Sequence, residues 1–225
     1  MKKLIVALDM QDKNKALAMV DKISPWVDMF KIGPILFLQN GPELLRMIKL
    51  RRKEVFLDLK FYDIPATVKR AVESACEMGV YSLTLHSSGG EEMLKAAAQV
   101  SQRPKLWAVT ILTSQHASVE DVVERAKLAK SCGLDGVIAS PLEIKAIKEA
   151  CGADFTVVTP GIRTDGAKDD QKRTATPVEA VTAGADFIVV GRPVIEAKDP
   201  IAAARKILEE IEVKQEGRRK IEEGR

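Results

Sequence analysis

Eight short runs rich in apolar and β-branched residues recur along the chain at intervals of roughly 19 to 32 residues, and amphipathic segments separate them. In one such segment, residues 66–78, the apolar side chains recur at the spacing of a helix. Continuous apolar runs are typical of strands that are buried on both faces of a parallel sheet. The pattern therefore predicts an α/β fold built from eight strand and helix units, a (β/α)8 TIM barrel in a single domain. The expected strands are residues 4–9, 29–33, 55–60, 81–86, 106–112, 136–140, 155–159 and 187–191.

The main structural alternative is an open, doubly wound sheet. Such a sheet usually has fewer strands, and its nucleotide-binding form needs a glycine-rich first turn that residues 7–16 lack. We expect the barrel to occupy residues 1–212 as the catalytic domain. Residues 213–225 are highly charged with few apolar side chains, which predicts a helix extension or a disordered tail. Four glycines are expected to cap helices at their C-termini: Gly79, Gly133, Gly152 and Gly184.

Charge, hydropathy and cysteine content narrow the possible partners and the compartment. The 35 basic and 32 acidic residues are spread along the chain and leave a net charge of +3, so no nucleic-acid-binding stripe is predicted. No apolar stretch reaches membrane-spanning length, and the short apolar run at the start meets Asp9, unlike a signal peptide. The three cysteines form no CxxC pair, and their odd number argues against a disulfide framework. We therefore expect a cytoplasmic protein with neither a nucleic-acid nor a membrane partner.

Three charged residues follow the apolar start of the third expected strand: Asp58, Lys60 and Asp63. Removing a charge from water costs several kcal/mol unless partners compensate, so these residues predict a paired array. Residues two apart on a strand share a face, which places Asp58 and Lys60 together. The Ile64 and Pro65 step ends the strand, because the residue before proline is extended and proline suits the first turn of a helix. The charges are thus expected at the C-terminal mouth of the strand.

The other expected strands also end in polar side chains, and barrel enzymes carry their chemistry at these ends. The residues are Asp9, Lys31, His86, Thr113, Ser140 and Thr159. The eighth strand runs into Gly191 and Arg192, where glycine lets backbone N–H groups approach an anion and arginine supplies a fork of donors. Because loops after the seventh and eighth strands often bind phosphate, we expect a phosphorylated ligand. The long polar loop of residues 161–173 could close over it as a lid.

Two other kinds of site are not expected. The chain has only two histidines, His86 and His116, and neither has a cysteine or carboxylate cluster beside it, so a histidine-based metal site is improbable on sequence grounds. A GxSxG motif, which would support hydrolysis by a nucleophilic serine, is absent from the sequence. The chemistry is therefore expected to rest on the lysines and carboxylates at the strand ends.

The residues at these strand ends carry a resemblance to a known family. The segment DLKFYDIPAT at residues 58–67, together with ALD at 7–9, KIG at 31–33, TPGIR at 159–163 and VGRP at 190–193, closely resembles the orotidine 5'-phosphate decarboxylase family. The likeness spans nearly the whole chain. The DxKxxD motif is fairly specific, and the continuation through Ile64, Pro65 and Thr67 favours this family within a broader superfamily of phosphosugar enzymes.

The resemblance implies a role for each matching residue. Asp9 is expected to bind the ribose or base region of the substrate, and Lys31, Asp58 and Lys60 to form the central charge array. Asp63 and Thr67 match positions that the family donates across a dimer interface, so a homodimer with shared active sites is expected. The remaining substrate-binding positions are Thr113 at the pyrimidine, Pro160 at the start of the capping loop, Arg163 within that loop, and Gln171, Gly191 and Arg192 at the phosphate.

The reaction that the resemblance implies is the decarboxylation of orotidine 5'-monophosphate to uridine 5'-monophosphate and CO2 in de novo pyrimidine biosynthesis. The electron pair left at C6 lies in the ring plane, outside the π system, so its stabilisation must be electrostatic. Lys60 is expected to supply that stabilisation and then the proton. Asp58 and Asp63 would hold Lys60 in place while Lys31 balances the array, and neither a cofactor nor a metal is expected.

Three alternative functions remain open. A sibling barrel of the same superfamily could act as a Mg2+-dependent keto-sugar-phosphate decarboxylase or synthase, and sensitivity to EDTA would reveal it. A Schiff-base aldolase could use Lys31 or Lys60, although flanking carboxylates favour a protonated, non-nucleophilic lysine. A non-catalytic barrel could bind a phosphorylated ligand without turnover.

Overall fold

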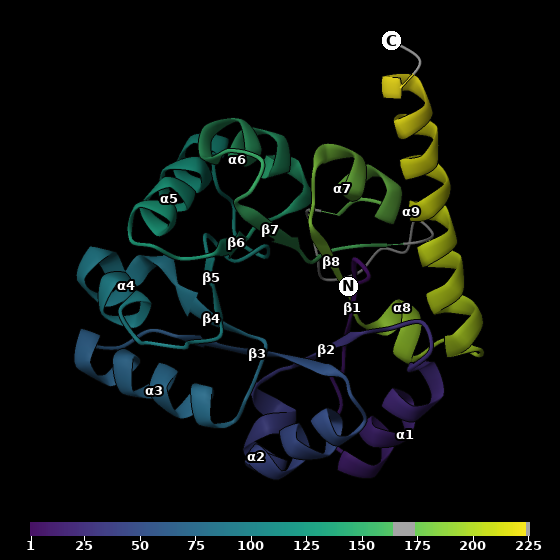
Figure 1. Ribbon diagram of the computed structural model, residues 1–225, viewed down its shortest axis with the longest axis horizontal. Coiled ribbons are helices and arrows are strands. Elements are labelled where there is room, and N and C mark those ends of the chain that lie inside the picture. The colour runs from purple at the N-terminus through teal and green to yellow at the C-terminus, as the bar shows by residue number, and fades with distance from the viewer. Residues whose placement is uncertain (164–173, 224–225) are drawn as a thin grey trace.

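Eight parallel strands, paired in sequence order, close into a barrel that is surrounded by helices (Figure 1). The computed structural model describes residues 1–163 and 174–223, with side chains described through residue 213. The strands are β1 (Leu4–Ala7), β2 (Met29–Ile32), β3 (Glu54–Phe61), β4 (Ser82–His86), β5 (Lys105–Val109), β6 (Gly136–Ile138), β7 (Thr156–Thr159) and β8 (Phe187–Val190). The helices are α1 (Lys13–Ile23), α2 (Pro34–Leu50), α3 (Pro65–Glu77), α4 (Gly90–Ala98), α5 (Val119–Ser131), α6 (Ile144–Cys151), α7 (Pro177–Ala183), α8 (Arg192–Ile195) and α9 (Pro200–Glu223). Short 3-10 turns, η1 (Ser87–Gly89) and η2 (Pro141–Glu143), follow β4 and β6.

The predicted (β/α)8 barrel is confirmed, and the open doubly wound sheet is wrong because β1 pairs with β8 and closes the sheet. Each predicted run overlaps one strand, and the largest difference is in the fifth strand, which ends at Val109 rather than at residue 112. The charged segment that begins at residue 213 continues α9 as far as Glu223, and Figure 1 shows this helix extending beyond the barrel. The four predicted capping glycines all follow helices and adopt positive φ angles of 63°, 86°, 86° and 113° in chain order.

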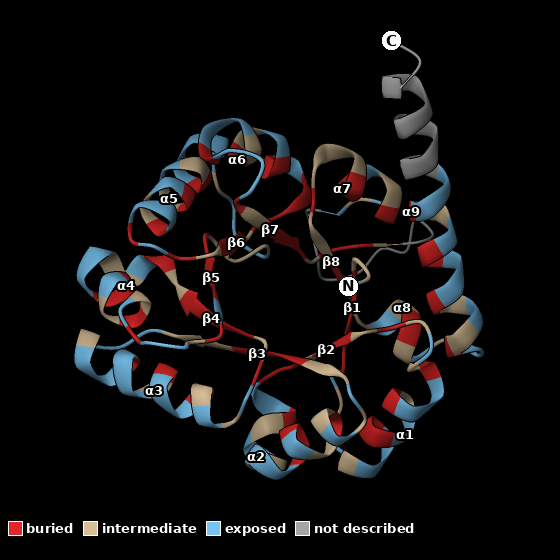
Figure 2. Cartoon of the chain, viewed as in Figure 1, coloured by how far each residue is buried: buried red, intermediate tan, exposed pale blue. Residues whose placement is uncertain are grey.

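The apolar core has two layers, because alternate residues of each strand point inside or outside the barrel. The outer layer lies between the strands and the helices, as the buried inner faces of the helices in Figure 2 show. The inner layer fills the barrel itself and centres on Trp107, which meets Phe56 edge-on with ring centroids 4.8 Å apart. This cluster of buried side chains packs the interior of the barrel beneath the C-terminal ends of the strands.

Aspartates tie neighbouring strands together at the N-terminal rim, the end of the barrel where the strands begin. Asp28, Asp135 and Asp186 stand immediately before β2, β6 and β8. Their carboxylates accept hydrogen bonds from backbone N–H groups on the preceding unit, at 2.8 Å from Lys2, 2.9 Å from Leu106 and 2.7 Å from Val157. A charge-assisted bond of this kind stabilises the fold by about 1.5–3 kcal/mol. The N-terminal rim is therefore a structural rim, and the opposite one is left for a site.

Candidate active site

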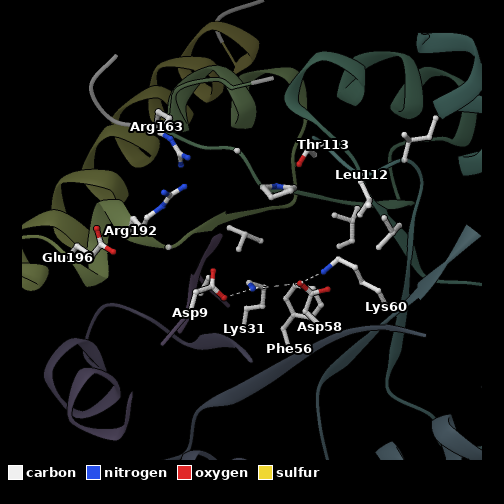
Figure 3. A pocket seen from close by; sticks show the side chains of 18 residues that line it. Asp9, Lys31, Phe56, Asp58, Lys60, Leu112, Thr113, Arg163, Arg192 and Glu196 are labelled. Atoms are coloured by element: carbon white, nitrogen blue, oxygen red, sulfur yellow. Dashed lines mark hydrogen bonds and ion pairs between the residues drawn. The ribbon is translucent and has the colours of Figure 1, made fainter. Parts of the chain in front are cut away.

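A cavity of about 450 Å³ opens at the C-terminal rim, the end of the barrel where the strands finish (Figure 3). Its volume lies within the range typical of small-molecule sites, roughly 300–1,000 Å³. The strands and the loops that follow them supply its lining. Nine of the residues predicted from the sequence line this cavity: Asp9, Lys31, Asp58, Lys60, Thr113, Pro160, Arg163, Gly191 and Arg192.

Four charged side chains form a row across one side of the cavity, as the dashed lines in Figure 3 show. Asp9 Oδ1 lies 2.8 Å from Lys31 Nζ, and Lys31 Nζ lies 3.7 Å from Asp58 Oδ2. The same Oδ2 atom lies 2.8 Å from Lys60 Nζ. The signs alternate along the row, so each ammonium faces at least one carboxylate.

The two side chains in the middle of the row are more buried than the two at its ends. The side chains of Asp58 and Lys31 are only 11% and 13% exposed, whereas those of Lys60 and Asp9 are 36% and 55% exposed. Buried charges need partners, and the middle pair has them on both sides. The outer pair retains accessible surface, and Lys60 and Asp9 can therefore contact a ligand.

An irregular segment of β3 brings Lys60 to the cavity. The pairing of β3 with β4 passes from Leu57 opposite Leu83 directly to Phe61 opposite Leu85, so residues 58–60 form a bulge. Within it, Lys60 has a φ of 51°, a left-handed conformation that is uncommon for a residue other than glycine. Bulges and strained backbones of this kind re-aim side chains and cluster at functional sites. The sequence predicted the shared face of Asp58 and Lys60, but a bulge within the strand was not predicted.

Two arginines occupy the other side of the cavity. Figure 3 shows the side chains of Arg163 and Arg192 directed toward the same region, across the cavity from the row of charges. Arg192 begins α8 directly after Gly191, whose missing side chain would otherwise lie 3.5 Å from Asp9 Oδ2. Arg163 is held by its backbone N–H, which donates to Ala175 O at 3.0 Å. Two guanidinium groups and an open glycine backbone are suited to bind an anion.

Apolar residues and one carboxylate complete the lining, and the sequence analysis missed them. Seven further apolar side chains line the cavity: Ala7, Phe56, Val109, Ile111, Leu112, Ile138 and Val189. In the sequence they belong to or follow the strand runs, and they cannot be told from ordinary core residues by type. Glu196, just after α8, also lines the cavity. Its only sequence signal is its position four residues beyond Arg192, one helical turn away.

The remaining predicted residues do not line this cavity or lie outside the described part of the chain. Asp63 and Thr67 are exposed, and Asp63 Oδ1 accepts a hydrogen bond from Ile64 N–H at 2.7 Å. Gln171 falls within 164–173, outside the described residues.

His86 lies on the same rim but outside the described cavity lining. Its Nδ1 lies 3.0 Å from Ser88 Oγ, and its ring centroid is 5.9 Å from that of Tyr62. Burial, followed by the nearby positive charges of Arg125 and Lys60, lowers the pKa of His86 below its ordinary value. The neutral form is therefore favoured near neutral pH, and His86 adds no positive charge to the row beside it.

The fold and the cavity together define a TIM-barrel protein with an enzyme-type site, in which a row of alternating aspartates and lysines faces two arginines. Residues 2–207 match the model of the family described as "Orotidine 5'-phosphate decarboxylase / HUMPS family". The chain belongs to this family, as the sequence motifs predicted, and its assignment to the carboxy-lyases follows.

Individual relatives agree with the family match. The chain is 48% identical to a protein named orotidine 5'-phosphate decarboxylase from Trichlorobacter lovleyi, over 93% of this chain and 95% of that protein. It is 46% identical to one of the same name from Moorella thermoacetica, covering 94% and 92% of the two chains. Among solved structures, orotidine 5'-phosphate decarboxylase from Lactobacillus acidophilus matches with a TM-score of 0.82 at 36% identity, over 94% of this chain and 99% of that one. The Pyrococcus horikoshii structure of the same name gives a TM-score of 0.80 at 25% identity, over 93% and 99%.

Across residues 1–163 and 174–223, no helix is both long and apolar enough to cross a membrane. In the same part of the chain, histidine, cysteine and carboxylate side chains do not gather in groups of three or more that could hold a metal ion.

Proposed function

We propose that the protein converts orotidine 5'-monophosphate to uridine 5'-monophosphate and CO2, with Lys60 as the group that stabilises the developing charge and donates the proton. The observation that carries this proposal is the row of Asp9, Lys31, Asp58 and Lys60 along one side of the cavity. Membership of the decarboxylase family supports it. A role for the protein in pyrimidine biosynthesis follows from this reaction.

The chemistry requires a fixed positive charge near C6. Loss of CO2 leaves an electron pair in the ring plane, where the ring carbonyls cannot delocalise it directly. An ammonium group that is already oriented stabilises this charge without reorganising at the moment of reaction. The 2.8 Å contact with Asp58 holds Lys60 Nζ in that role, and the exposed third of the Lys60 side chain leaves it open to the substrate. The same ammonium can then deliver its proton to C6.

The other residues of the cavity would orient the nucleotide. Arg192, the Gly191 backbone and Arg163 would bind the phosphate, with Gln171 as a further candidate from the sequence. Asp9 is exposed enough to accept a hydrogen bond from the ribose, and Thr113 and Pro160 would border the base. Phosphate binding remote from C6 can stabilise a closed state that is complete only at the transition state.

A homodimer with shared active sites forms part of the proposal. Tyr62 and Ile64, which flank Asp63, are each 65% exposed, and Leu38, on the neighbouring α2, is 82% exposed. All three belong to segments that follow the C-terminal ends of β2 and β3, and exposed apolar side chains of this size are suited to a protein interface. Burying them against a second copy would carry Asp63 and Thr67 toward the partner's cavity.

The dimer is tested by Ile64→Lys, with Leu50→Lys as its control. Leu50 is 69% exposed at the far end of α2, away from this rim. Sedimentation should show a dimer for the wild type and Leu50→Lys, and a monomer with little activity for Ile64→Lys. A fully active monomer at the assay concentration would refute the shared site.

The activity is tested by ultraviolet absorbance of orotidine 5'-monophosphate incubated with the protein in EDTA. Lys60→Ala should lower kcat by at least roughly 1,000-fold, since it removes both the stabilising charge and the proton donor. Lys145→Ala, on the exposed face of α6 beside Glu149, is the matched control and should turn over normally.

Each alternative function predicts a different result in this assay. Loss of activity in EDTA that returns with Mg2+ would favour a metal-dependent sugar-phosphate enzyme of the same superfamily. Trapping with borohydride would favour a Schiff base, and tight binding without turnover would favour a non-catalytic barrel. A cytoplasmic location is also proposed, and the three free cysteines are compatible with it.

A further inference from the structure

Thr84 is a buried polar residue that neither the sequence motifs nor the cavity lining single out. It lies in the middle of β4 and has no exposed surface. Its neighbours Leu83 and Leu85 belong to the outer core, so Thr84 points into the barrel, beneath the cavity. A hydroxyl in such a place needs hydrogen-bond partners.

Both partners of Thr84 belong to the bulge of β3. Thr84 Oγ1 donates to Asp58 Oδ1 at 2.9 Å and accepts from the backbone N–H of Lys60, also at 2.9 Å. Thr84 is the single β4 residue between the pairs Leu57 with Leu83 and Phe61 with Leu85. It therefore stands opposite three residues of β3, where regular ladder bonds cannot form. The two hydrogen bonds of the Thr84 side chain take the place of these ladder bonds.

Each bond fixes one part of the charge row. The last torsion of an aspartate side chain is soft, so the carboxylate plane of Asp58 must be set by its contacts. With Thr84 on Oδ1, the other oxygen, Oδ2, is turned toward both Lys60 Nζ and Lys31 Nζ. The second bond satisfies the Lys60 N–H in its left-handed conformation, which the surrounding structure must maintain.

We propose that Thr84 is a positioning residue of this site, whose hydroxyl aligns the Asp58 carboxylate and the Lys60 backbone at the same time. The catalytic part of this inference rests on the proposed decarboxylase function. Valine has the same branched shape as threonine but can make neither bond. Serine can make both.

The test compares Thr84→Val with Thr84→Ser and uses Ser82→Ala as a matched control. Ser82 is also buried on the inner face of β4, but its hydroxyl has no hydrogen-bond partner among the described residues. Thr84→Val should lower kcat by roughly 10- to 100-fold, the loss expected for one hydrogen bond to a charged group. Its KM should change less than about twofold, because Thr84 lies outside the cavity lining. Thr84→Ser should restore kcat to within about threefold of the wild type, and Ser82→Ala should match the wild type.

A second measurement does not depend on turnover. Amide hydrogen exchange at Lys60 should be at least roughly tenfold faster in Thr84→Val than in the wild type, and unchanged in Ser82→Ala. If the wild type fails to decarboxylate the nucleotide, the proposed function fails while this comparison still tests the positioning role. Should Thr84→Val not fold, Thr84→Ala carries the same expectations. Normal kcat together with normal exchange at Lys60 in the folded variant would overturn the inference, and so would a loss of kcat that serine does not rescue.

Discussion

Replacing Asp58 with asparagine should disorganise the charge row while leaving its shape almost unchanged. In the native protein, one oxygen of Asp58 lies 2.8 Å from Lys60 Nζ and 3.7 Å from Lys31 Nζ. The asparagine side chain can still accept hydrogen bonds, but it no longer places a negative charge between two ammonium groups. Lys60, whose side chain is already 36% exposed, would then be drawn toward water rather than held at the cavity.

The size of the effect can be worked out from these two distances. At an effective dielectric constant of about 20, unit charges 2.8 Å and 3.7 Å apart attract by about 6 and 4.5 kcal/mol. Desolvation of Asp58 offsets much of this, and breaking a buried ion pair typically costs about 3–5 kcal/mol. Because asparagine keeps an acceptor, we take the lower end, about 3 kcal/mol. At 1.36 kcal/mol per tenfold change, this corresponds to a decrease of roughly 150-fold in kcat.

The assay measures kcat and KM for orotidine 5'-monophosphate in Asp58→Asn and in a control, Asp21→Asn. Asp21 also pairs with a cation, Arg51, at 2.6 Å, but it lies on α1 outside the cavity lining. The control should keep wild-type kcat. A folded Asp58→Asn variant with kcat within about threefold of the wild type would refute the argument that this carboxylate organises the row.

Two further predictions concern the phosphate side of the cavity and the N-terminal rim. Arg192→Gln should lower kcat/KM for the nucleotide by roughly 10- to 150-fold, the range expected for the loss of a hydrogen bond to a charged group. Turnover of the unphosphorylated nucleoside should be unchanged. An equal loss for both substrates would contradict phosphate binding by Arg192. Burial alone would raise the pKa of Asp135, but hydrogen bonds from Leu106 N–H, Lys105 and Arg103 outweigh it and lower the pKa below its ordinary value. Since the folded-state pKa is lowered, the stabilisation is present above the ordinary aspartate pKa of about 4 and is lost as the pH falls through the folded-state value. Asp135→Asn should therefore lower the free energy of unfolding by about 1–3 kcal/mol at pH 7, and this difference should shrink steadily as the pH falls below about 4, as measured by urea unfolding. A pH-independent difference would contradict it.

The eight strands were predictable because local sequence determines them almost completely. Each strand contains a run of apolar residues that favours burial, and glycines such as Gly184, with a φ of 113°, follow the helices that precede several strands. The rim of the site followed from the same reasoning, since parallel strands in a barrel all end on one side. Residues such as Asp9, Lys31 and Arg192 were brought together by topology rather than by proximity in the chain.

The details of the site could not be predicted, because they depend on contacts between strands. The bulge at Asp58, Leu59 and Lys60 arises from the register between β3 and β4. The sequence DLK alone is equally compatible with a regular strand. Thr84 looks like an ordinary β-branched residue until its two bonds to this bulge are seen. The apolar residues of the cavity lining were not predicted for a related reason. Ile111 and Leu112 follow β5 in the sequence and look like a continuation of that buried strand.

Asp135 at the N-terminal rim and Asp9 at the C-terminal rim use their carboxylates in opposite ways, and the difference indicates which of the two can bind a ligand. Asp135 accepts hydrogen bonds from Leu106 N–H, Lys105 and Arg103, so both of its oxygens are committed to the protein. Asp9, at the other rim, accepts from Lys31 and is 55% exposed, which leaves acceptor capacity directed into the cavity. A carboxylate whose acceptor capacity is already used cannot bind a ligand without breaking a bond that stabilises the fold. Asp9 can bind one without that loss, and for this reason we expect it to face the substrate.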